Sequence, residues 1–221
     1  MTEACLAGRT FRTILKVTTQ DKATMATHSV HSATAAEIAA VADVLTLAFG
    51  TDPAARWSWA DPRVYLASFP RFVRAFGGAA FERGTAYVVD DNKGAALWLP
   101  PGAEPDETAM GSLMQETVPE SIGKDGLSVM QQMESYHPRE PHWYLPLIGI
   151  DPAHQGRGLG GVLMRHALAE CDRDGCLAYL ESSNPRNVPL YQHLGFELLG
   201  TIQAGTSPKL FPMLRKPQRR S

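Results

Sequence analysis

The stretch that most constrains this chain is residues 154–161, HQGRGLGG, in which four of the last six residues are glycine. An apolar run precedes it and an amphipathic run follows, so we expect a strand, a glycine-rich turn and a helix. A glycine inside a helix costs roughly 1 kcal/mol relative to alanine, so these glycines need a reason. Free backbone amides at a helix start, together with the helix dipole, favour a phosphate or pyrophosphate. We interpret the stretch as a phosphate-binding loop rather than as a tight turn that binds nothing.

Two known phosphate loops fit this stretch poorly. Residues 156–161 formally match the dinucleotide fingerprint G-x-G-x-x-G, and Glu181 ends the next expected strand, near where a ribose-binding acid would lie. In the dinucleotide fold, however, the first glycine follows the strand closely, whereas here residues 151–155 intervene. Only 40 residues follow Glu181, too few to complete two mononucleotide-binding halves. No Gly-Lys-Ser/Thr sequence follows the glycines, which excludes a Walker A loop.

Helical and strand-like segments alternate along the rest of the chain. The expected strands are residues 86–89, 95–99, 143–150 and 177–181, with a further strand after Gly195. Two expected helices begin at Thr34 and at Asp61, and residues 105–135 are expected to be helical with a break near Pro119. A further helix should run from the glycine turn to Gly175, and a short one should cover residues 187–194. This order predicts one α/β domain with a central mixed sheet.

The composition is that of an ordinary globular protein. Of the 221 residues 44% are apolar and 20% are charged, and the net charge of −2 gives no general attraction to nucleic acid or to an anionic membrane. No apolar run approaches the roughly 20 residues that span a bilayer. The three cysteines form no C-x-x-C pair, so they suggest neither a disulfide framework nor a zinc site. We therefore predict a cytoplasmic protein with no metal, no nucleic-acid partner and no membrane association.

The two ends of the chain lack a strong pattern. We predict a loose N-terminal extension over residues 1–24, a single domain over residues 25–216 and a disordered basic tail over residues 217–221. The tail is the end of a basic run, RKPQRRS, which follows Leu214 and which we interpret as solvated. Met25 is an alternative start, so the first residue of the protein stays open.

A more specific resemblance rests on two signatures. Residues 155–160, QGRGLG, match the pattern Q/R-x-x-G-x-G/A, and residues 184–196, NPRNVPLYQHLGF, match N-x-x-x-x-x-x-Y-x-x-x-G-F. Both patterns, one helix and one strand apart, are typical of the GNAT superfamily of acetyl-CoA-dependent N-acetyltransferases. The chain resembles this family over residues 142–200, the predicted CoA-binding core, and its puromycin N-acetyltransferase-like members most closely. The resemblance implies a GNAT-like fold, with a central mixed, mostly antiparallel, splayed β-sheet flanked by helices.

The resemblance also implies acetyl-CoA as the cosubstrate. The amides of residues 155–161 would hold the CoA pyrophosphate, and the backbone of residues 148–150 would pair with the pantetheine arm as an added strand does. Gly149 would leave room where the strands separate. Asn184 and Asn187 are candidates for pantetheine contacts, with a helix cap or turn as the alternative interpretation. The expected cofactor-binding residues are Ile148, Gly149, Ile150, Gln155, Gly156, Arg157, Gly158, Leu159, Gly160, Gly161, Asn184 and Asn187.

Acetyl transfer from a thioester to an amine needs a neutral amine, and the departing thiolate benefits from a proton. Tyr191 matches the family position that often supplies this proton, and its alternative interpretation is a core aromatic. Glu181 is our candidate for the general base. Three further residues stay open as bases because no spacing distinguishes them: Glu134, His137 and His142.

These interpretations lead to a predicted N-acetyltransferase, in which a primary amine of a small molecule or peptide attacks the thioester directly. Trp57 and Trp59 lie in a region that often lines the acceptor site in this family, although aromatic packing explains them more simply. Two alternatives stay open: a non-catalytic acyl-CoA-binding sensor or interaction module, and a transferase that uses a longer acyl-CoA. The acceptor and the choice between a monomer and a homodimer also stay open.

Overall fold

The structure is a computed structural model that describes residues 28–218 as a seven-stranded sheet covered by helices. The strands are β1 (Val30–Ser32), β2 (Ala86–Val89), β3 (Gly94–Leu99), β4 (His142–Ile150), β5 (Leu177–Ser182), β6 (Glu197–Leu198) and β7 (Phe211–Arg215). The helices are α1 (Ile38–Ala48), α2 (Pro53–Ser58), α3 (Pro62–Gly77), α4 (Ala79–Glu82), α5 (Glu107–Thr117), α6 (Glu120–Tyr136), α7 (Leu159–Asp174) and α8 (Val188–His193), with short 3₁₀ turns η1 (Ala35–Glu37), η2 (Pro152–His154) and η3 (Pro185–Asn187).

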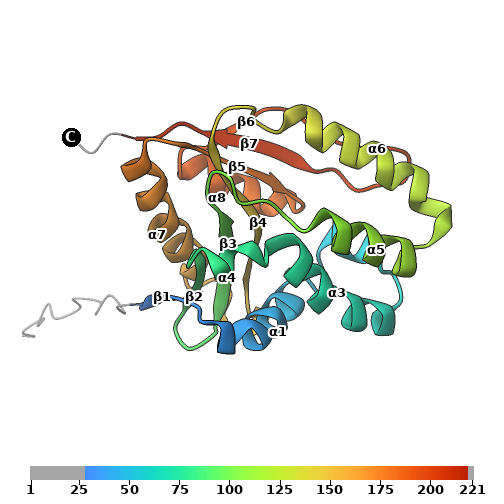
Figure 1. Cartoon of the computed structure of the whole chain (residues 1–221), viewed down its shortest axis with the longest axis horizontal. Helices are drawn as coiled ribbons and strands as arrows, with labels where there is room; N and C mark the ends of the chain where they lie inside the picture. Colours follow the sequence, from blue (N-terminus) through green and yellow to red (C-terminus); the bar gives the residue numbers. More distant parts are fainter. Residues whose placement is uncertain (1–27, 219–221) are drawn as a thin grey trace, which may run out of the picture.

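The strands follow the order β1-β2-β3-β4-β5-β7-β6, and every neighbouring pair is antiparallel except β4 and β5. The mixed, mostly antiparallel sheet expected from the sequence is therefore confirmed. β4 and β5 pair only through residues 142–144 and 177–179, although both strands continue beyond them. The sheet is thus splayed between its two parallel strands, and Figure 1 shows β4 running down the middle of the molecule away from β5.

Helices cover both faces of the sheet, and each face has its own hydrophobic core. One core joins α1 and α3 to Leu97 of β3, Leu147 of β4 and Tyr179 of β5. The other core joins α7 and α8 to Trp98 of β3 and Leu180 of β5. Figure 1 shows α7 on one side of the sheet and α1 and α3 on the other. Because neighbouring strand residues point to opposite faces, successive residues of β5 belong to different cores.

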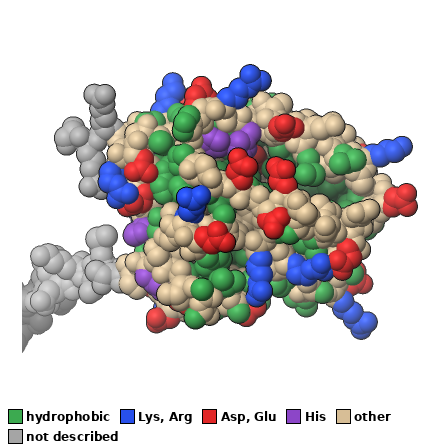
Figure 2. Space-filling view, viewed as in Figure 1, with side chains coloured by type: hydrophobic (Ala, Val, Ile, Leu, Met, Phe, Trp, Pro, Cys, Tyr) green, Lys and Arg blue, Asp and Glu red, His purple; other side chains and the backbone are tan. Residues whose placement is uncertain are grey.

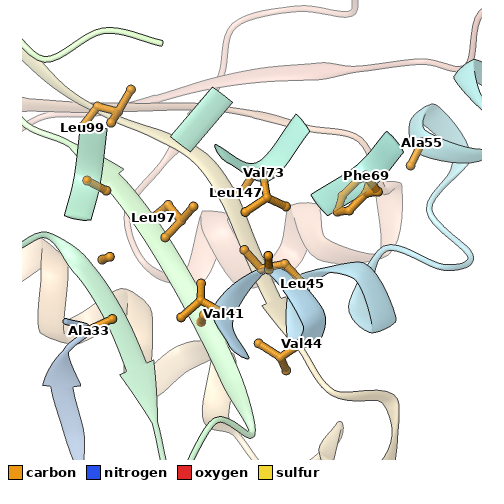
Figure 3. Packing of buried hydrophobic residues seen from close by; sticks show 14 of the residues in the cluster. Ala33, Val41, Val44, Leu45, Ala55, Phe69, Val73, Leu97, Leu99 and Leu147 are labelled. Carbon is orange, nitrogen blue, oxygen red and sulfur yellow. The ribbon is translucent and has the colours of Figure 1, made fainter. Parts of the chain in front are cut away.

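The first core depends on close packing between α1 and the middle of the sheet. Val41 and Leu45 of α1 are fully buried, and in Figure 3 they lie next to Leu97 and Leu147. Phe69 of α3 is 1% exposed and extends this cluster, and its ring centroid lies 5.1–6.1 Å from four neighbouring aromatic rings. Such burial is worth roughly 1.5–3 kcal/mol for each large apolar side chain.

Helix-start patterns in the sequence identify the right residues. The Glu37 carboxylate accepts a hydrogen bond from the Thr34 amide at 2.9 Å, as the capping-box pattern predicts, and another from the Thr34 hydroxyl at 2.9 Å. Asp61 caps α3 through the amides of residues 63 and 64. Asp52-Pro53 has the same cap-and-proline pattern and begins α2, a helix that our sequence prediction omitted.

The C-terminal basic run needs a correction. We interpreted the run after Leu214 as solvated, but Arg215 ends β7 and is only 3% exposed. Its guanidinium makes a two-point ion pair with the Asp172 carboxylate, at 2.7 and 2.9 Å, and its Nε donates to the Leu194 carbonyl at 3.0 Å. The planar guanidinium matches a carboxylate at two points, and this pairing explains why a basic residue lies buried in the sheet.

Other expectations about the ends of the chain lie partly outside the described residues. The predicted extension over residues 1–24 and Met25 lie outside residues 28–218, as do residues 219–221 of the predicted tail. The domain limits at residues 24 and 216 therefore stay predictions. β1 and β7 have no counterpart among the strands that we predicted. Within residues 28–218, no helix has both the length and the apolar character needed to cross a membrane.

Candidate active site

The glycine loop joins β4 to α7 and leaves its amides open. Gly156 and Gly158 have φ angles of 75° and 79°, a left-handed conformation that strongly favours glycine. A Cβ atom added at either residue would meet nothing within 4 Å, so the space above the loop is empty of protein. Within the described chain, no amide of residues 155–161 donates to a loop, turn or cap carbonyl or to a side chain. The loop therefore presents unpaired donors at the start of a 16-residue helix.

The polar side chains of the loop contact the protein itself. The Gln155 side-chain amide donates to the Ile150 carbonyl at 3.1 Å, which ties the loop to the end of β4. Arg157 is exposed, and its guanidinium lies 3.4 Å from the Ala153 carbonyl. The donors that the loop leaves open are therefore its amides, and Arg157 is the one cationic side chain among residues 155–161.

The end of β4 has one free edge. Gly149 and Ile150 pair with β3 on one side, but no β5 residue pairs with β4 beyond Tyr144. An added Cβ at Gly149 would lie 2.5 Å from the Cβ of Ala48, so its missing side chain accommodates α1. The room that we expected from Gly149 is thus filled by a helix, and the open space comes from the separation of the strands instead.

Three of the predicted elements meet at Gly160. An added Cβ there would lie 3.9 Å from side-chain atoms of Ile150, at the end of β4, and of Leu190 on α8. Leu159 and Gly161 are buried under the same helix start. The free edge of β4, the glycine loop and α8 therefore surround one region of the surface, beside the splay in the sheet.

Tyr191 lies on α8, in the core on the α7 face of the sheet. The residue is 5% exposed and its ring packs edge-on against Phe196, with centroids 6.1 Å apart. Burial, with a contribution from the nearby charge of Asp52, raises the pKa of the hydroxyl well above its usual value. No hydrogen bond from this hydroxyl to another described residue is present, so its proton is available. Tyr191 is thus both a core aromatic and a protonated donor.

For Asn184 and Asn187 the sequence left open whether they contact pantetheine or serve as cap or turn residues. The Asn184 side chain accepts a hydrogen bond from the Arg186 amide at 3.0 Å and caps η3. Asn187 precedes α8 and is exposed, with no side-chain cap of its own. Asn184 therefore has the turn-residue role that was its alternative interpretation, and both residues lie in the connection from β5 to α8.

A buried carboxylate that the sequence prediction missed lies beside this connection. Asp52 is 7% exposed, and it caps α2 by accepting from the amides of residues 54 and 55. Its other oxygen accepts a hydrogen bond from the Ser183 hydroxyl at 2.5 Å. Burial raises the pKa of Asp52, while the three hydrogen bonds oppose the rise. The hydrogen bond from Ser183 to Asp52 holds the start of α2 against the end of β5. The Asp-Pro pattern in the sequence could have indicated the helix cap by Asp52, but no pattern indicates the bond to Ser183.

Glu181, the candidate base, is buried on the other face of the sheet. Its side chain is 4% exposed, and it lies near the hydroxyls of Tyr144 and Tyr179. Burial raises the pKa of the Glu181 carboxyl to about 7, and the two tyrosine hydroxyls, acting as donors, limit the rise. Even so, neither Glu181 Oε1 nor the Tyr179 hydroxyl has a hydrogen-bond partner of good geometry among the described residues. A carboxyl that titrates near neutral pH and keeps an oxygen unpaired is suited to accept a proton.

Two of the other base candidates lie beside Glu181. His137 follows the end of α6, and its Nδ1 is 4.0 Å from Glu181 Oε1. The Nε2 atoms of His137 and His142 are 2.9 Å apart. Figure 2 shows acidic and basic side chains interspersed over the face in view, with histidine side chains among them. The structure thus brings together the side chains of Glu181, His137 and His142, whereas the Glu134 side chain lies exposed on α6 and its backbone carbonyl accepts the His137 amide at 3.3 Å.

The two tryptophans serve to pack the α2 region. Trp59 is 2% exposed, and its indole N–H donates to the Thr117 hydroxyl at 2.9 Å. Trp57 is half-buried, and its indole N–H donates to the Thr206 hydroxyl at 3.2 Å. Trp59 therefore belongs to the core, and Trp57 joins α2 to the loop before β7. No group of three histidine, cysteine or acidic side chains within residues 28–218 is arranged to hold a metal ion.

The alternation along β5 separates the two candidate catalytic groups. Tyr179 belongs to the core on the α1 face, and Glu181, two residues later, points to that same face. Tyr191 belongs to the core on the α7 face. Glu181 and Tyr191, the two candidate groups, therefore lie on opposite faces of the sheet.

Comparisons with known proteins agree with this arrangement. The model of the acetyltransferase (GNAT) family matches residues 57–196. An uncharacterised N-acetyltransferase of Schizosaccharomyces pombe is 28% identical over 154 residues, which are 63% of this chain and 62% of that protein. A mycothiol acetyltransferase of Mycobacteroides abscessus is 43% identical over 61 residues, which are 26% of this chain and 21% of that protein. The matches therefore span less than two thirds of these curated relatives.

Solved structures resemble the fold over most of the chain. A Corynebacterium glutamicum protein described as a histone acetyltransferase and related acetyltransferase has a TM-score of 0.64 and 24% identity, covering 88% of this chain and 98% of that one. The polyamine N-acetyltransferase of Drosophila melanogaster has a TM-score of 0.63 and 18% identity, covering 86% of this chain and all of that one. At these identities the likeness establishes the fold alone. The family match, which covers more than half of the chain, goes further: the chain belongs to the acetyltransferase (GNAT) family.

Proposed function

We propose that this protein transfers the acetyl group of acetyl-CoA to a primary amine of a small molecule or peptide. The observation that carries the proposal is the placement of Glu181 and Tyr191 on opposite faces of the splayed sheet. In this proposal the pantetheine arm pairs with the free edge of β4 over residues 148–150, and the pyrophosphate binds the open amides of residues 155–161.

The proposed reaction uses one face of the sheet for the amine and the other for the thiolate. The amine approaches from the α1 face, where the Glu181 carboxylate removes a proton from the ammonium group, either directly or through a water molecule. The neutral amine then attacks the thioester carbonyl. The thiolate leaves toward the α7 face, where the Tyr191 hydroxyl donates a proton to it. Because Glu181 must be deprotonated to act, kcat/KM should rise with pH through about 7 and then level off.

Ligand binding tests the first half of the proposal. CoA or acetyl-CoA at 100 times its dissociation constant should add about 2.7 kcal/mol to the free energy of unfolding, seen as a higher melting temperature. NADH serves as the control for the dinucleotide interpretation of the glycine loop. A shift with NADH and none with CoA would refute the proposed cosubstrate.

An acceptor screen that follows thiol release tests the second half. Diamines, arylalkylamines, amino acids and short peptides, each supplied with acetyl-CoA, should include at least one amine that releases CoA thiol and gains an acetyl group by mass spectrometry. Glu181→Gln is the control, and it should lower turnover about 10²–10⁴-fold. Tight CoA binding without transfer to any amine would indicate a sensor, and transfer only from longer thioesters would indicate a different acyl donor.

A further inference from the structure

The loop between α6 and β4 brings two histidines together beside the buried carboxylate. His137 follows α6 directly, with its amide bonded to the carbonyls of residues 133 and 134, and His142 begins β4 five residues later. The two rings lie edge to face, with centroids 4.7 Å apart. Both ends of the loop are thus held by secondary structure, so the contact is part of the fold.

The hydrogen bonds around this pair determine its tautomers. His142 Nδ1 lies 2.8 Å from the Glu140 carbonyl, which can only accept, so His142 carries its proton on Nδ1. His142 Nε2 is then a bare acceptor when the ring is neutral. The partner at 2.9 Å, His137 Nε2, must therefore be the donor. A neutral His137 has one proton, so its Nδ1 is bare, and this is the atom that faces Glu181 Oε1 at 4.0 Å.

Solvent reaches this group of side chains through His137. The Glu181 side chain is 4% exposed, whereas the His137 side chain is 36% exposed. Three tyrosines lie around them: Tyr136 near Tyr179, and Tyr144 and Tyr179 beside Glu181. Burial raises the pKa of Tyr144 and Tyr179, so these two hydroxyls remain protonated and cannot accept a proton. Their rings pack edge-on against the His137 ring, each with centroids 4.9 Å apart.

We propose that His137 passes the proton of Glu181 to solvent, and that His142 is a positioning residue that holds His137 in the required tautomer. The inference rests on the proposed function, because Glu181 is the base in that reaction. Acetyl transfer from a thioester to an ammonium group gives an amide, a thiol and one free proton. That proton begins on Glu181, which is buried, so each turnover needs a route by which it can leave.

The steps balance without any further reactant. The substrate ammonium gives a proton to the Glu181 carboxylate, which becomes a carboxylic acid. The acid gives that proton to His137 Nδ1, which restores the carboxylate and leaves His137 as an imidazolium. The imidazolium then loses a proton to water. Burial and the neighbouring His142 lower the pKa of His137 to about 4, below the value of about 7 for Glu181, so the imidazolium is a minor, short-lived species. It is the Nδ1 proton that goes to water, which restores the neutral ring with its proton on Nε2.

The separation of 4.0 Å between His137 Nδ1 and Glu181 Oε1 is too long for a hydrogen bond, and it must shorten or contain a water for transfer. Catalytic hydrogen bonds are often long in a ligand-free structure and tighten when substrates bind.

Nitrogen-15 NMR of the histidine rings tests the tautomers without any substrate. At pH 7 we expect both rings to be neutral, with the proton of His142 on Nδ1 and that of His137 on Nε2. In a His142→Phe variant, His137 should lose this preference and populate both tautomers. A charged His137 at pH 7, or a proton on its Nδ1 in the wild-type protein, would overturn the inference whatever the enzyme's substrate is.

Steady-state kinetics with an amine acceptor tests the transfer. His137→Gln keeps a donor for His142 but cannot take up a proton, so we expect kcat to fall about tenfold or more with the CoA dissociation constant unchanged. Added imidazole should restore part of the lost activity. Glu134→Gln, one turn earlier on α6 and exposed, is the matched control and should behave as wild type.

The two possible failures give different results. If wild type acetylates an amine and His137→Gln turns over at the wild-type rate across pH 6–8, the inference is wrong and the proposed function stands. If wild type acetylates no amine, the proposed function fails and the inference fails with it, even where the ring tautomers are as expected.

Discussion

Replacing Glu181 with glutamine should make the protein more stable at high pH while nearly abolishing turnover. Burial raises the pKa of this carboxyl from 4.5 to about 7. Between these two values the folded protein keeps a proton that the unfolded chain has lost. The free energy of unfolding therefore falls as pH rises through this window, and the full stabilising effect of the proton is present only below pH 4.5. Glutamine is similar in shape and cannot ionise, so its contribution does not depend on pH.

The size of the effect follows from the same pKa values. One pKa unit corresponds to about 1.4 kcal/mol, so the rise from 4.5 to about 7 corresponds to about 3 kcal/mol. The Glu181 side chain is only 4% exposed, so solvent screens little of this energy. Relative to wild type, the variant should thus gain about 3 kcal/mol between pH 4.5 and pH 8. His137 has the opposite dependence, because burial lowers its pKa to about 4, but it is present in both proteins.

Urea denaturation of both proteins at pH 4.5, 6, 7 and 8 measures this difference directly. The difference in unfolding free energy should grow with pH and stop growing above about 7, with equal m-values in the two proteins. A difference that stays constant within about 0.5 kcal/mol over this range would show that the folded state does not raise the pKa of Glu181. The carboxyl would then be an ordinary solvated acid, and the choice of Glu181 as a base tuned to neutral pH would lose its physical reason.

Three further outcomes test other parts of the site. Tyr191→Phe should reduce single-turnover rates about 10²-fold with unchanged CoA affinity, since the ring packing is kept. A variant with wild-type rates would show that Tyr191 has only a structural role. Gly158→Val should weaken CoA binding tenfold or more, measured by calorimetry, because the φ angle there is 79°. Gly160→Ala adds a methyl group that makes only ordinary 3.9 Å contacts, so its CoA dissociation constant should stay within about threefold of wild type. Arg215→Met removes one partner of the buried pair with Asp172 and should cost about 3 kcal/mol by urea denaturation, and a loss below about 1 kcal/mol would contradict the importance of that pair.

Local patterns in the sequence were enough to predict the strand, the glycine turn and the helix on the proposed cofactor side of the site. The glycine turn and the preceding strand follow from short-range rules, namely glycine spacing and an apolar run. Tyr191, by contrast, was predicted from the resemblance to the GNAT family. The same rules identified Thr34 and Asp61 as helix starts. The side chains of Thr34 and Asp61 interact with residues no more than three positions away, so each helix cap can be predicted from a few neighbouring residues.

The surroundings of Glu181 and the links at the ends of β5 and β7 could not be predicted in this way, because their contacts join distant segments. Asp52 bonds to Ser183 across 131 residues, and Arg215 bonds to Asp172 across 43. Four base candidates had equal standing in the sequence, since a carboxylate and a histidine become a pair only when a helix end and two strand ends meet. The structure distinguishes them by burial, which leaves Glu134 exposed and Glu181 enclosed.

The register of β5 decides on which face the base lies, and β7 is the strand that holds this register. β4 stops pairing with β5 at Tyr179, two residues before Glu181, whereas β7 pairs with β5 along its length and lies opposite Glu181 at Pro212. A slip of one residue would turn the carboxyl to the α7 face, onto the side of Tyr191, because side chains alternate along a strand. The Arg215 ion pair anchors the end of β7 to α7 and so opposes such a slip. The C-terminal strand, which our sequence prediction did not include, therefore keeps Glu181 and Tyr191 on opposite faces of the splayed sheet.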